Sequence, residues 1–320
     1  MRRFLALART AALEALAEPL SAVLFLSALL MVHLAPVFHY HRFGEAARLP
    51  RECGLSALLV FGLVFATSAA VRTIGRELSS GTASVALALA VPRAMFHCAK
   101  TAGVFFAFLL FAAAAATATI LAERTSVLGA HIAAMGGDAR IWGPGLASGV
   151  GTTLLAFGAA AAANRFLNWR FCSSACLLTA VAQPVALSAA AAMGGFAGES
   201  FSSVARTVPA FMLLAGACLV FIAIAAALAT RLGQATVAAV LSGAVAVSFL
   251  AEPVASACRP AGWAIRALLP VISEFWKADA LLGGGVIAAA EVARLLSVAA
   301  LLMALWLGVG SALLAGRELP

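Results

Sequence analysis

The sequence contains very few charged residues. Asp, Glu, Lys and Arg make up 11% of its 320 residues, whereas hydrophobic residues make up 64%. Ordinary globular domains carry about 25% charged and roughly 45–50% apolar residues. A water-soluble fold of this length could not bury so much apolar surface and cover itself with so few charges. The composition therefore excludes a soluble enzyme and a disordered chain, and it indicates a membrane protein that crosses the bilayer several times.

Lysine is almost absent, and so are the motifs of enzyme chemistry. The two lysines, Lys100 and Lys277, do not lie in a GxxxxGK[ST] sequence. Because a P-loop needs that lysine to reach the phosphates of a nucleotide, we expect no ATP site of this kind in the chain. HExxH and GxSxG are missing as well, which disfavours an intramembrane protease. The sequence thus offers no catalytic residue and predicts no cofactor bound by this chain.

Metal-binding and disulfide patterns are also missing. The six cysteines form no CxxC pair and no metal-finger spacing, and they are Cys53, Cys98, Cys172, Cys176, Cys218 and Cys258. We interpret them as apolar thiols and leave open a disulfide between Cys53 and Cys258. A histidine cluster at 33, 39 and 41 has no carboxylate or cysteine at ligand spacing, so we predict no metal site there.

Long hydrophobic runs dominate what is present. A helix needs about 20 apolar residues to cross the bilayer, and a bilayer favours helices because they satisfy every backbone polar group internally. Eight runs qualify: 20–38, 54–71, 101–121, 146–164, 174–195, 208–230, 235–251 and 290–314. We therefore predict an all-α polytopic membrane protein, in which residues 1–320 form a single transmembrane domain.

The basic residues are spread between these runs. An even number of spans puts both termini on one side, which then carries 11 of the 21 Lys and Arg residues. The positive-inside rule is nearly tied, but the loops on this side are shorter and their cations denser. We therefore predict cytoplasmic termini. Scattered cations of this kind suit membrane anchoring and do not suggest nucleic-acid binding.

Three segments do not fit a membrane span. Residues 1–19 have an apolar face (Phe4, Leu5, Ala8, Ala11, Ala12, Ala15), which predicts an amphipathic helix on the membrane surface. Residues 72–100 have charged ends around an apolar middle that is too short to span. Residues 252–289 form a long outer loop that prolines break into short pieces, and Phe275 to Lys277 within it resemble an interfacial anchor.

The segment 72–100 resembles the first cytoplasmic loop of ABC type-2 permeases. The residues that carry this resemblance are Arg72, Arg76, Glu77, Gly81, Thr82, Pro92, Arg93 and Lys100. The N-terminal segment resembles the family's interfacial helix through Arg2, Arg3, Arg9, Glu14 and Pro19. The outer loop is similar to that of permeases linked to copper-enzyme maturation, through Leu269, Pro270, Phe275 and Asp279.

The resemblance implies the permease subunit of an ABC exporter in the plasma (inner) membrane. ATP and Mg²⁺ would be bound by a separate ATPase chain, residues 79–91 would form a coupling helix that docks on it, and a second permease chain would complete the complex. The family usually has six spans, so 146–195 is interpreted as an inserted helical hairpin. Two alternatives remain open: a non-transporting membrane scaffold, and a secondary transporter, which would need polar residues at the membrane midplane.

Overall fold

The described residues of the computed structural model form helices joined by short turns. These residues are 1–38, 45–79, 81, 91–134, 142–192 and 200–317, and they contain no β-strand. The first half holds α1 (Arg2–Ala17), α2 (Pro19–Leu34), η1 (Ala35–Val37), α3 (Arg48–Ala70), η3 (Val71–Arg76), α4 (Glu77–Ser79) and α6 (Arg93–Ala134). The second half holds α7 (Trp142–Leu167), α8 (Phe171–Ala192), α9 (Ser200–Ala229), α10 (Gln234–Phe249), α11 (Ala251–Ala257), α12 (Arg259–Leu268), α13 (Ile272–Phe275), η5 (Asp279–Gly284) and α14 (Ala289–Ala315).

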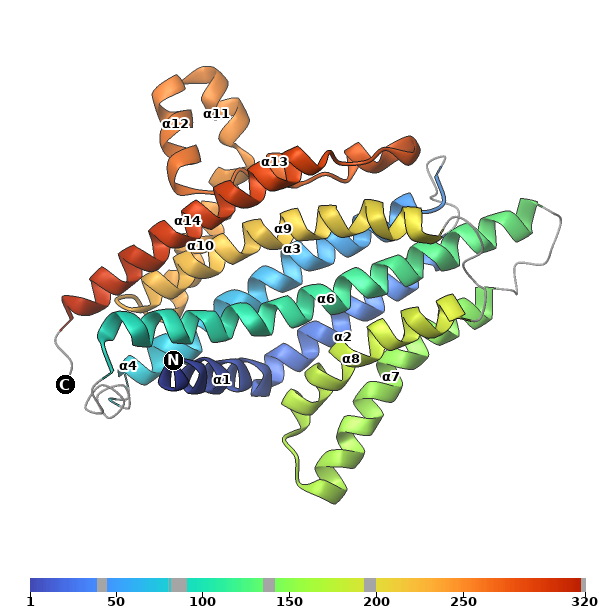
Figure 1. Ribbon diagram of the computed structural model, residues 1–320, viewed down its shortest axis with the longest axis horizontal. Coiled ribbons are helices and arrows are strands. Elements are labelled where there is room, and N and C mark those ends of the chain that lie inside the picture. The colour runs from blue at the N-terminus through green and yellow to red at the C-terminus, as the bar shows by residue number, and fades with distance from the viewer. Residues whose placement is uncertain (39–44, 80, 82–90, 135–141, 193–199, 318–320) are drawn as a thin grey trace.

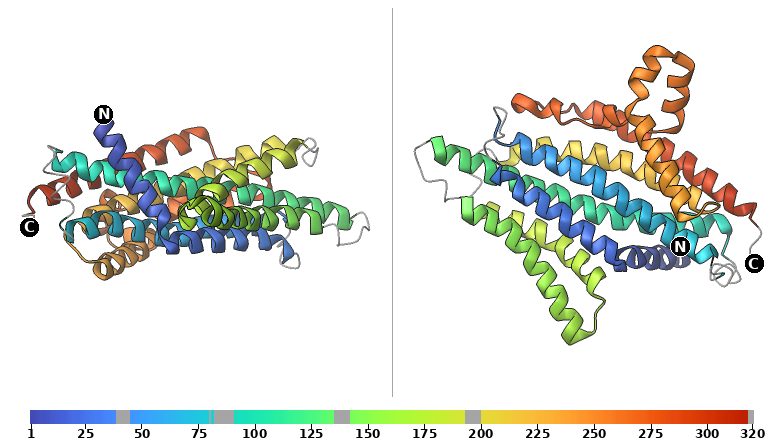
Figure 2. Two further views of the ribbon diagram at one scale, coloured as in Figure 1. Left: turned by 90° about the horizontal axis from the view of Figure 1, so that it is seen from below. Right: turned by 180° about the vertical axis from the view of Figure 1, so that it is seen from behind.

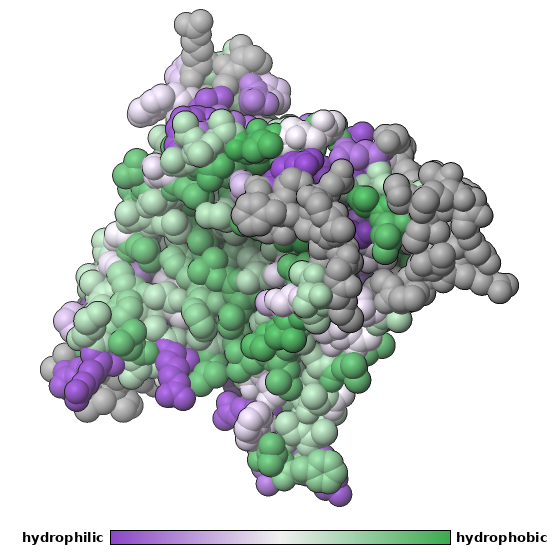
Figure 3. Space-filling model, turned by 45° about the vertical axis from the view of Figure 1, so that its right-hand side comes forward, coloured by the Kyte–Doolittle hydropathy of each residue, from purple (hydrophilic) through white to green (hydrophobic). Residues whose placement is uncertain are grey.

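Seven helices in the described part of the chain are long and apolar enough to cross a membrane. Their bounds are Pro19–Val37, Arg48–Arg76, Arg93–Ala130, Ala147–Leu167, Phe171–Ala192, Arg206–Ala229 and Ala289–Ala315. Each contains or overlaps one of the predicted spans. Figure 3 shows a largely hydrophobic face with hydrophilic patches toward its edges, as expected for a lipid-facing surface. The chain is therefore an all-α, polytopic membrane protein.

The predicted eighth span, 235–251, corresponds in position to α10, which is shorter than a typical membrane span. Helix α10 has 16 residues and covers about 24 Å, which is less than the bilayer core. The chain bends at Leu250, and α11 begins one residue later. The α11–α12 hairpin then projects sideways from the bundle, and α13 and η5 lead on to α14 (Figure 1). Segment 252–289 is thus mostly helical, although prolines do begin or interrupt its pieces.

Helix α9 lies at the centre of the bundle. It packs against α3, α6 and α14, and most of its residues from Ala210 to Ala229 are buried. Three phenylalanines from α2, α3 and α6 form an aromatic cluster within the same hydrophobic core. The ring of Phe25 lies edge-on to Phe65 and Phe111, at centroid distances of 6.0 Å and 5.0 Å. Such contacts fix the helix register beyond what apolar burial alone provides.

Helix α6 is much longer than the span predicted at 101–121. Its 42 residues extend about 63 Å, roughly twice the thickness of the hydrocarbon core. It runs the length of the molecule in Figure 1. Hydropathy identifies only the stretch that lipid would cover, so it does not indicate that the helix continues to Ala134.

The predicted hairpin is formed by α7 and α8, which pack against each other and diverge from the bundle toward their turn (Figures 1 and 2). Gly149 of α7 lets this helix approach α2, because a methyl group there would collide with the ring of His33. The same region has the 145–149 GxxxG spacing, which favours close helix packing.

Helix α1 lies at a steep angle to the bundle helices and packs against α6 (left view of Figure 2). The described chain begins at α1 and ends at Arg317 near the same end of the bundle, which is called the termini-bearing end below (Figure 1). The buried residues of α1 are Ala11, Ala12, Ala15 and Leu16, whereas Leu5 is 58% exposed. The predicted apolar face is therefore buried only along its second half, since the first half extends beyond α6.

Gly103 makes the α1–α6 contact possible, and its replacement by alanine is expected to destabilise the fold. A methyl group there would lie 2.6 Å from Cβ of Ala11 and 2.9 Å from the backbone nitrogen of Ala12. Overpacking against backbone costs about 1–3 kcal/mol. Thermal unfolding in detergent measures the loss of stability in Gly103→Ala. Gly158→Ala on α7 is the matched control, because no atom lies within 4 Å of the added methyl group. Equal stability of the two variants would contradict this packing.

Candidate functional site

Three of the predicted site residues meet at the termini-bearing end. Lys100 Nζ lies 2.6 Å from Oε1 of Glu77 and 3.2 Å from Oε2 of Glu14. The Lys100 side chain is 2% exposed, while the two glutamates retain some contact with solvent. These residues come from α6, α4 and α1, so one buried ammonium ties three elements together. We call this group the Lys100 cluster.

A second ion pair reinforces the attachment of α1. Nη1 of Arg72 lies 2.6 Å from Oε2 of Glu18, the residue between α1 and α2. Pro19 follows as the first residue of α2, where the absence of its N–H is tolerated. The sequence indicated Arg72 and Pro19 as site residues but not Glu18, whose partner is 54 residues away.

The backbone at Arg72 and Arg76 is a π-helix, Val71–Arg76, that continues α3 directly into α4. Wide turns of this kind are rare and often occur at functional sites. The first part of segment 72–100 is therefore helical and continuous with α3. Arg76 is exposed at this end of the bundle.

Arg93 and the chain end are held together by backbone contacts. Nη1 of Arg93 donates to the carbonyl oxygens of Ala315 and Arg317, at 2.6 Å and 3.0 Å. These carbonyls at the end of α14 have no partner within the helix, so the guanidinium satisfies them and complements the helix dipole. Arg231 donates to the carbonyl of Leu313 at 3.1 Å, and Arg317 donates to that of Thr230.

Most of the predicted coupling helix, 79–91, lies outside the described residues, and so does Thr82. The described residues around it are Ser79, Gly81 and Val91. Gly81 has φ +74°, a backbone conformation that glycine adopts without strain, and a Cβ added there would meet no atom within 4 Å. Pro92 precedes the first residue of α6 and is exposed. Arg2, Arg3 and Arg9 of the N-terminal helix are exposed as well.

The predicted outer-loop residues connect α10 to α14. The hydroxyl of Ser248 on α10 donates to the carbonyl of Pro270 and accepts from the backbone nitrogen of Ile272 at 3.3 Å. Phe275 is 1% exposed, which corrects its assignment to an interfacial anchor. Leu269 is half-buried, and Asp279 is exposed at the start of η5.

A buried ion pair that the sequence did not indicate lies at the opposite end of the bundle. Nε of Arg51 lies 3.1 Å from Oε1 of Glu123, and their side chains are 6% and 1% exposed. The hydroxyl of Thr207 donates to both Glu123 oxygens, and Arg51 also donates to the carbonyl of Leu281 at 3.2 Å. This network joins α3, α6, α9 and η5. Both charged residues fall outside the predicted spans. The pair could have been predicted only if α6 had been expected to extend beyond residue 121 to Glu123.

A polar trio attaches the α7–α8 hairpin to α2. Nε2 of His33 lies 3.1 Å from Oε1 of Gln183, whose amide donates to the hydroxyl of Thr153 at 2.9 Å. All three side chains are buried. His33 therefore has a structural partner, while His39 and His41 lie outside the described residues. The described part of the chain holds no cluster of three or more metal-ligating side chains. All six cysteines are free, including Cys53 and Cys258.

Comparison with protein-family models, with curated proteins and with solved structures found no match to this chain. The functional interpretation consequently depends on the residues themselves and on where the fold places them.

Proposed function

We propose that this chain is the transmembrane permease subunit of an ABC exporter whose ATP is hydrolysed by a separate ATPase chain. The observation that carries the proposal is the Lys100 cluster. The resemblance points to Glu14, Glu77 and Lys100, and Lys100 contacts Glu14 and Glu77 across 86 and 23 residues of sequence. If the resemblance were due to chance, there would be no reason to expect these residues to contact each other in the fold. Their contact therefore supports the proposal.

The position of the cluster suits a coupling role. Glu77 stands before, and Lys100 after, the segment 79–91 that would dock on the ATPase. The cluster joins both flanks of this segment to α1, while Arg93 joins its second flank to the end of α14. A force applied to the docking segment would therefore reach α1, α3, α6 and α14 together. Two-state motion of this kind requires a ligand with different affinities for the two states, and ATP on the partner would supply it.

Two substitutions test the coupling role. Glu77→Lys places a second cation beside Lys100, and Gly81→Pro imposes a negative φ where the backbone has +74°. Both variants are expected to insert into membranes but to reduce permease-stimulated ATP hydrolysis by the purified complex by about tenfold or more. The matched control is Glu52→Lys, which reverses a charge in the half-exposed Arg48–Glu52 pair near the other end.

Full stimulation of ATP hydrolysis by both variants would overturn the coupling role. Purification of the folded chain without any ATPase subunit would favour the membrane scaffold instead. An ATP-independent flux that uncouplers abolish would favour a secondary transporter.

A further inference from the structure

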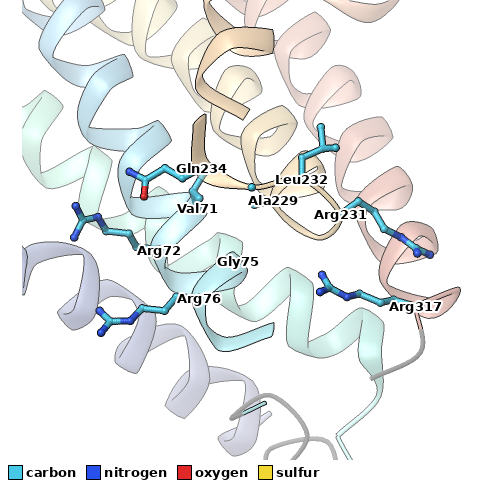
Figure 4. A pocket seen from close by; sticks show the side chains of 10 residues that line it. Val71, Arg72, Gly75, Arg76, Ala229, Arg231, Leu232, Gln234 and Arg317 are labelled. Atoms are coloured by element: carbon cyan, nitrogen blue, oxygen red, sulfur yellow. The ribbon is translucent and has the colours of Figure 1, made fainter. Parts of the chain in front are cut away.

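Four arginines surround a cavity at the termini-bearing end. This arginine cavity has a volume of about 480 Å³ and is lined by Arg72, Arg76, Arg231 and Arg317, together with Gln234 and small or apolar residues. Figure 4 shows Arg72 and Arg76 on one side, with their side chains directed away from Arg231 and Arg317, and Arg317 on the other side, with its side chain extending toward Gly75. Among the described residues, no acidic side chain lines the cavity. Arg72 and Arg76 also line a neighbouring pocket that contains Glu14, Glu18 and Glu77, so the positive field of the cavity depends on Arg231 and Arg317.

The charges of two of these arginines are not neutralised within the described chain. Arg72 pairs with Glu18, but Arg231 and Arg317 donate to the backbone carbonyls of Leu313 and Thr230, which carry no net charge. Helix α10 also begins at the cavity, and its N-cap residue, Gly233, has no side chain to cap the first turn. The N–H groups of this turn add partial positive charge to that of the guanidinium groups.

An apolar groove leads away from the cavity between α3 and α10. Its volume is about 570 Å³, and apolar side chains predominate among its residues, which run from Leu59 on α3 to Val71 at the start of η3 and from Gln234 to Phe249 on α10. The groove and the arginine cavity share Val71 and Gln234, so the two are continuous. Along α10 the groove extends about 22 Å, which exceeds the roughly 15 Å of one leaflet's hydrocarbon.

We propose that the arginine cavity and the α3–α10 groove form one binding site for an anionic phospholipid, with the phosphate in the cavity and an acyl chain in the groove. A basic cavity joined to an apolar groove matches an amphiphile with an anionic head, because arginine binds phosphate oxygens strongly and apolar walls cover the chain. The site requires only that the chain lies in a membrane, so it goes beyond the coupling role and does not depend on it.

Lipid binding to the purified full-length chain tests this proposal. Native mass spectrometry would compare phosphatidylglycerol with phosphatidylcholine of the same acyl chains, and the anionic lipid is expected to bind about tenfold more tightly or better. The double variant Arg231→Gln/Arg317→Gln should lose most of this preference while keeping hydrogen-bond donors for the two carbonyls. The double variant Arg165→Gln/Arg170→Gln, at the exposed α7–α8 turn, removes the same number of charges and should keep the preference.

The groove has its own matched pair of variants. Ala238 lines the groove, whereas its neighbour Ala239 is exposed and does not. Ala238→Phe is expected to weaken phosphatidylglycerol binding about tenfold, and Ala239→Phe to leave it unchanged. This pair of variants tests whether an acyl chain occupies the groove, even if the double arginine variant fails to fold.

A competition experiment distinguishes the phosphate of a lipid head group from free inorganic phosphate. If the ligand is a lipid, inorganic phosphate and a short-chain phosphatidylglycerol should displace the long-chain lipid only weakly. Equal affinity for phosphatidylglycerol and phosphatidylcholine would overturn the proposal, and so would equal binding by Ala238→Phe and Ala239→Phe. If inorganic phosphate at a matched concentration displaces the lipid, the site binds a free anion and the lipid proposal is wrong.

Discussion

Replacing Lys100 with methionine is expected to remove permease-stimulated ATP hydrolysis and to lower the free energy of unfolding by about 2 kcal/mol. The ammonium of Lys100 lies within ion-pair distance of both Glu14 and Glu77. Without it, the two carboxylates lose the positive charge that they share. Their partial exposure lets water reduce the repulsion, so the cost falls below that of a fully buried charge.

Single glutamate variants should have graded effects. Glu77 is closer to Lys100 than Glu14 is, at 2.6 Å against 3.2 Å, and its side chain is less exposed, at 24% against 40%. Glu77→Gln should therefore lower the free energy of unfolding more than Glu14→Gln does.

A triple variant, Glu14→Leu/Glu77→Leu/Lys100→Met, should be more stable than Lys100→Met alone, because apolar residues can replace a buried ion pair at little cost in stability. Thermal unfolding and ATP hydrolysis of each variant measure the two effects separately. Unchanged hydrolysis in Lys100→Met would contradict the coupling role.

Replacing Glu123 with glutamine should cause the largest loss of stability, about 3–5 kcal/mol. This change leaves the guanidinium of Arg51 buried without its nearest carboxylate, since Glu45 lies 3.8 Å away and is partly exposed. It also weakens the contact with Thr207 that joins α9 to the network. Thermal unfolding in detergent is the measurement.

The Arg48–Glu52 pair provides the control for this prediction. It lies on the same helix as Arg51, but its side chains are 32% and 35% exposed. Glu52→Gln should therefore change the free energy of unfolding by less than about 1 kcal/mol. Similar losses for Glu52→Gln and Glu123→Gln would show that the buried network does not hold this end of the bundle together.

The sequence predicted the membrane-spanning core well because lipid imposes a simple requirement on composition. Seven predicted spans overlap helices of the structure that are long enough to cross a membrane. The eighth predicted span, 235–251, corresponds in position to α10, but this helix of 16 residues ends at the bend at Leu250 and is shorter than a typical membrane span. The same method underestimated α6, since residues beyond 121 continue the helix without meeting the apolar criterion.

The candidate site was predictable only in part. Resemblance selected Glu14, Glu77 and Lys100 but gave no reason for them to touch, because residues so far apart in sequence meet only through the packing of α1 on α6. The Arg51–Glu123 pair was missed for a related reason. Each residue lies just beyond a hydrophobic run, where an isolated charge resembles an ordinary interfacial residue, and the pairing becomes visible only when both helices extend past the membrane core.

Photo-crosslinking from the start of α6 would detect the proposed ATPase partner in its native membrane. A photoreactive phenylalanine at Ala94, which is exposed and follows the proposed docking segment 79–91 in sequence, would be compared with one at Leu128, which is 52% exposed near the other end of the same helix. We expect Ala94 to crosslink in native membranes to a chain with an ATP-binding cassette, and Leu128 not to do so. Crosslinking of such a chain from neither position, in membranes where the protein is active, would contradict it.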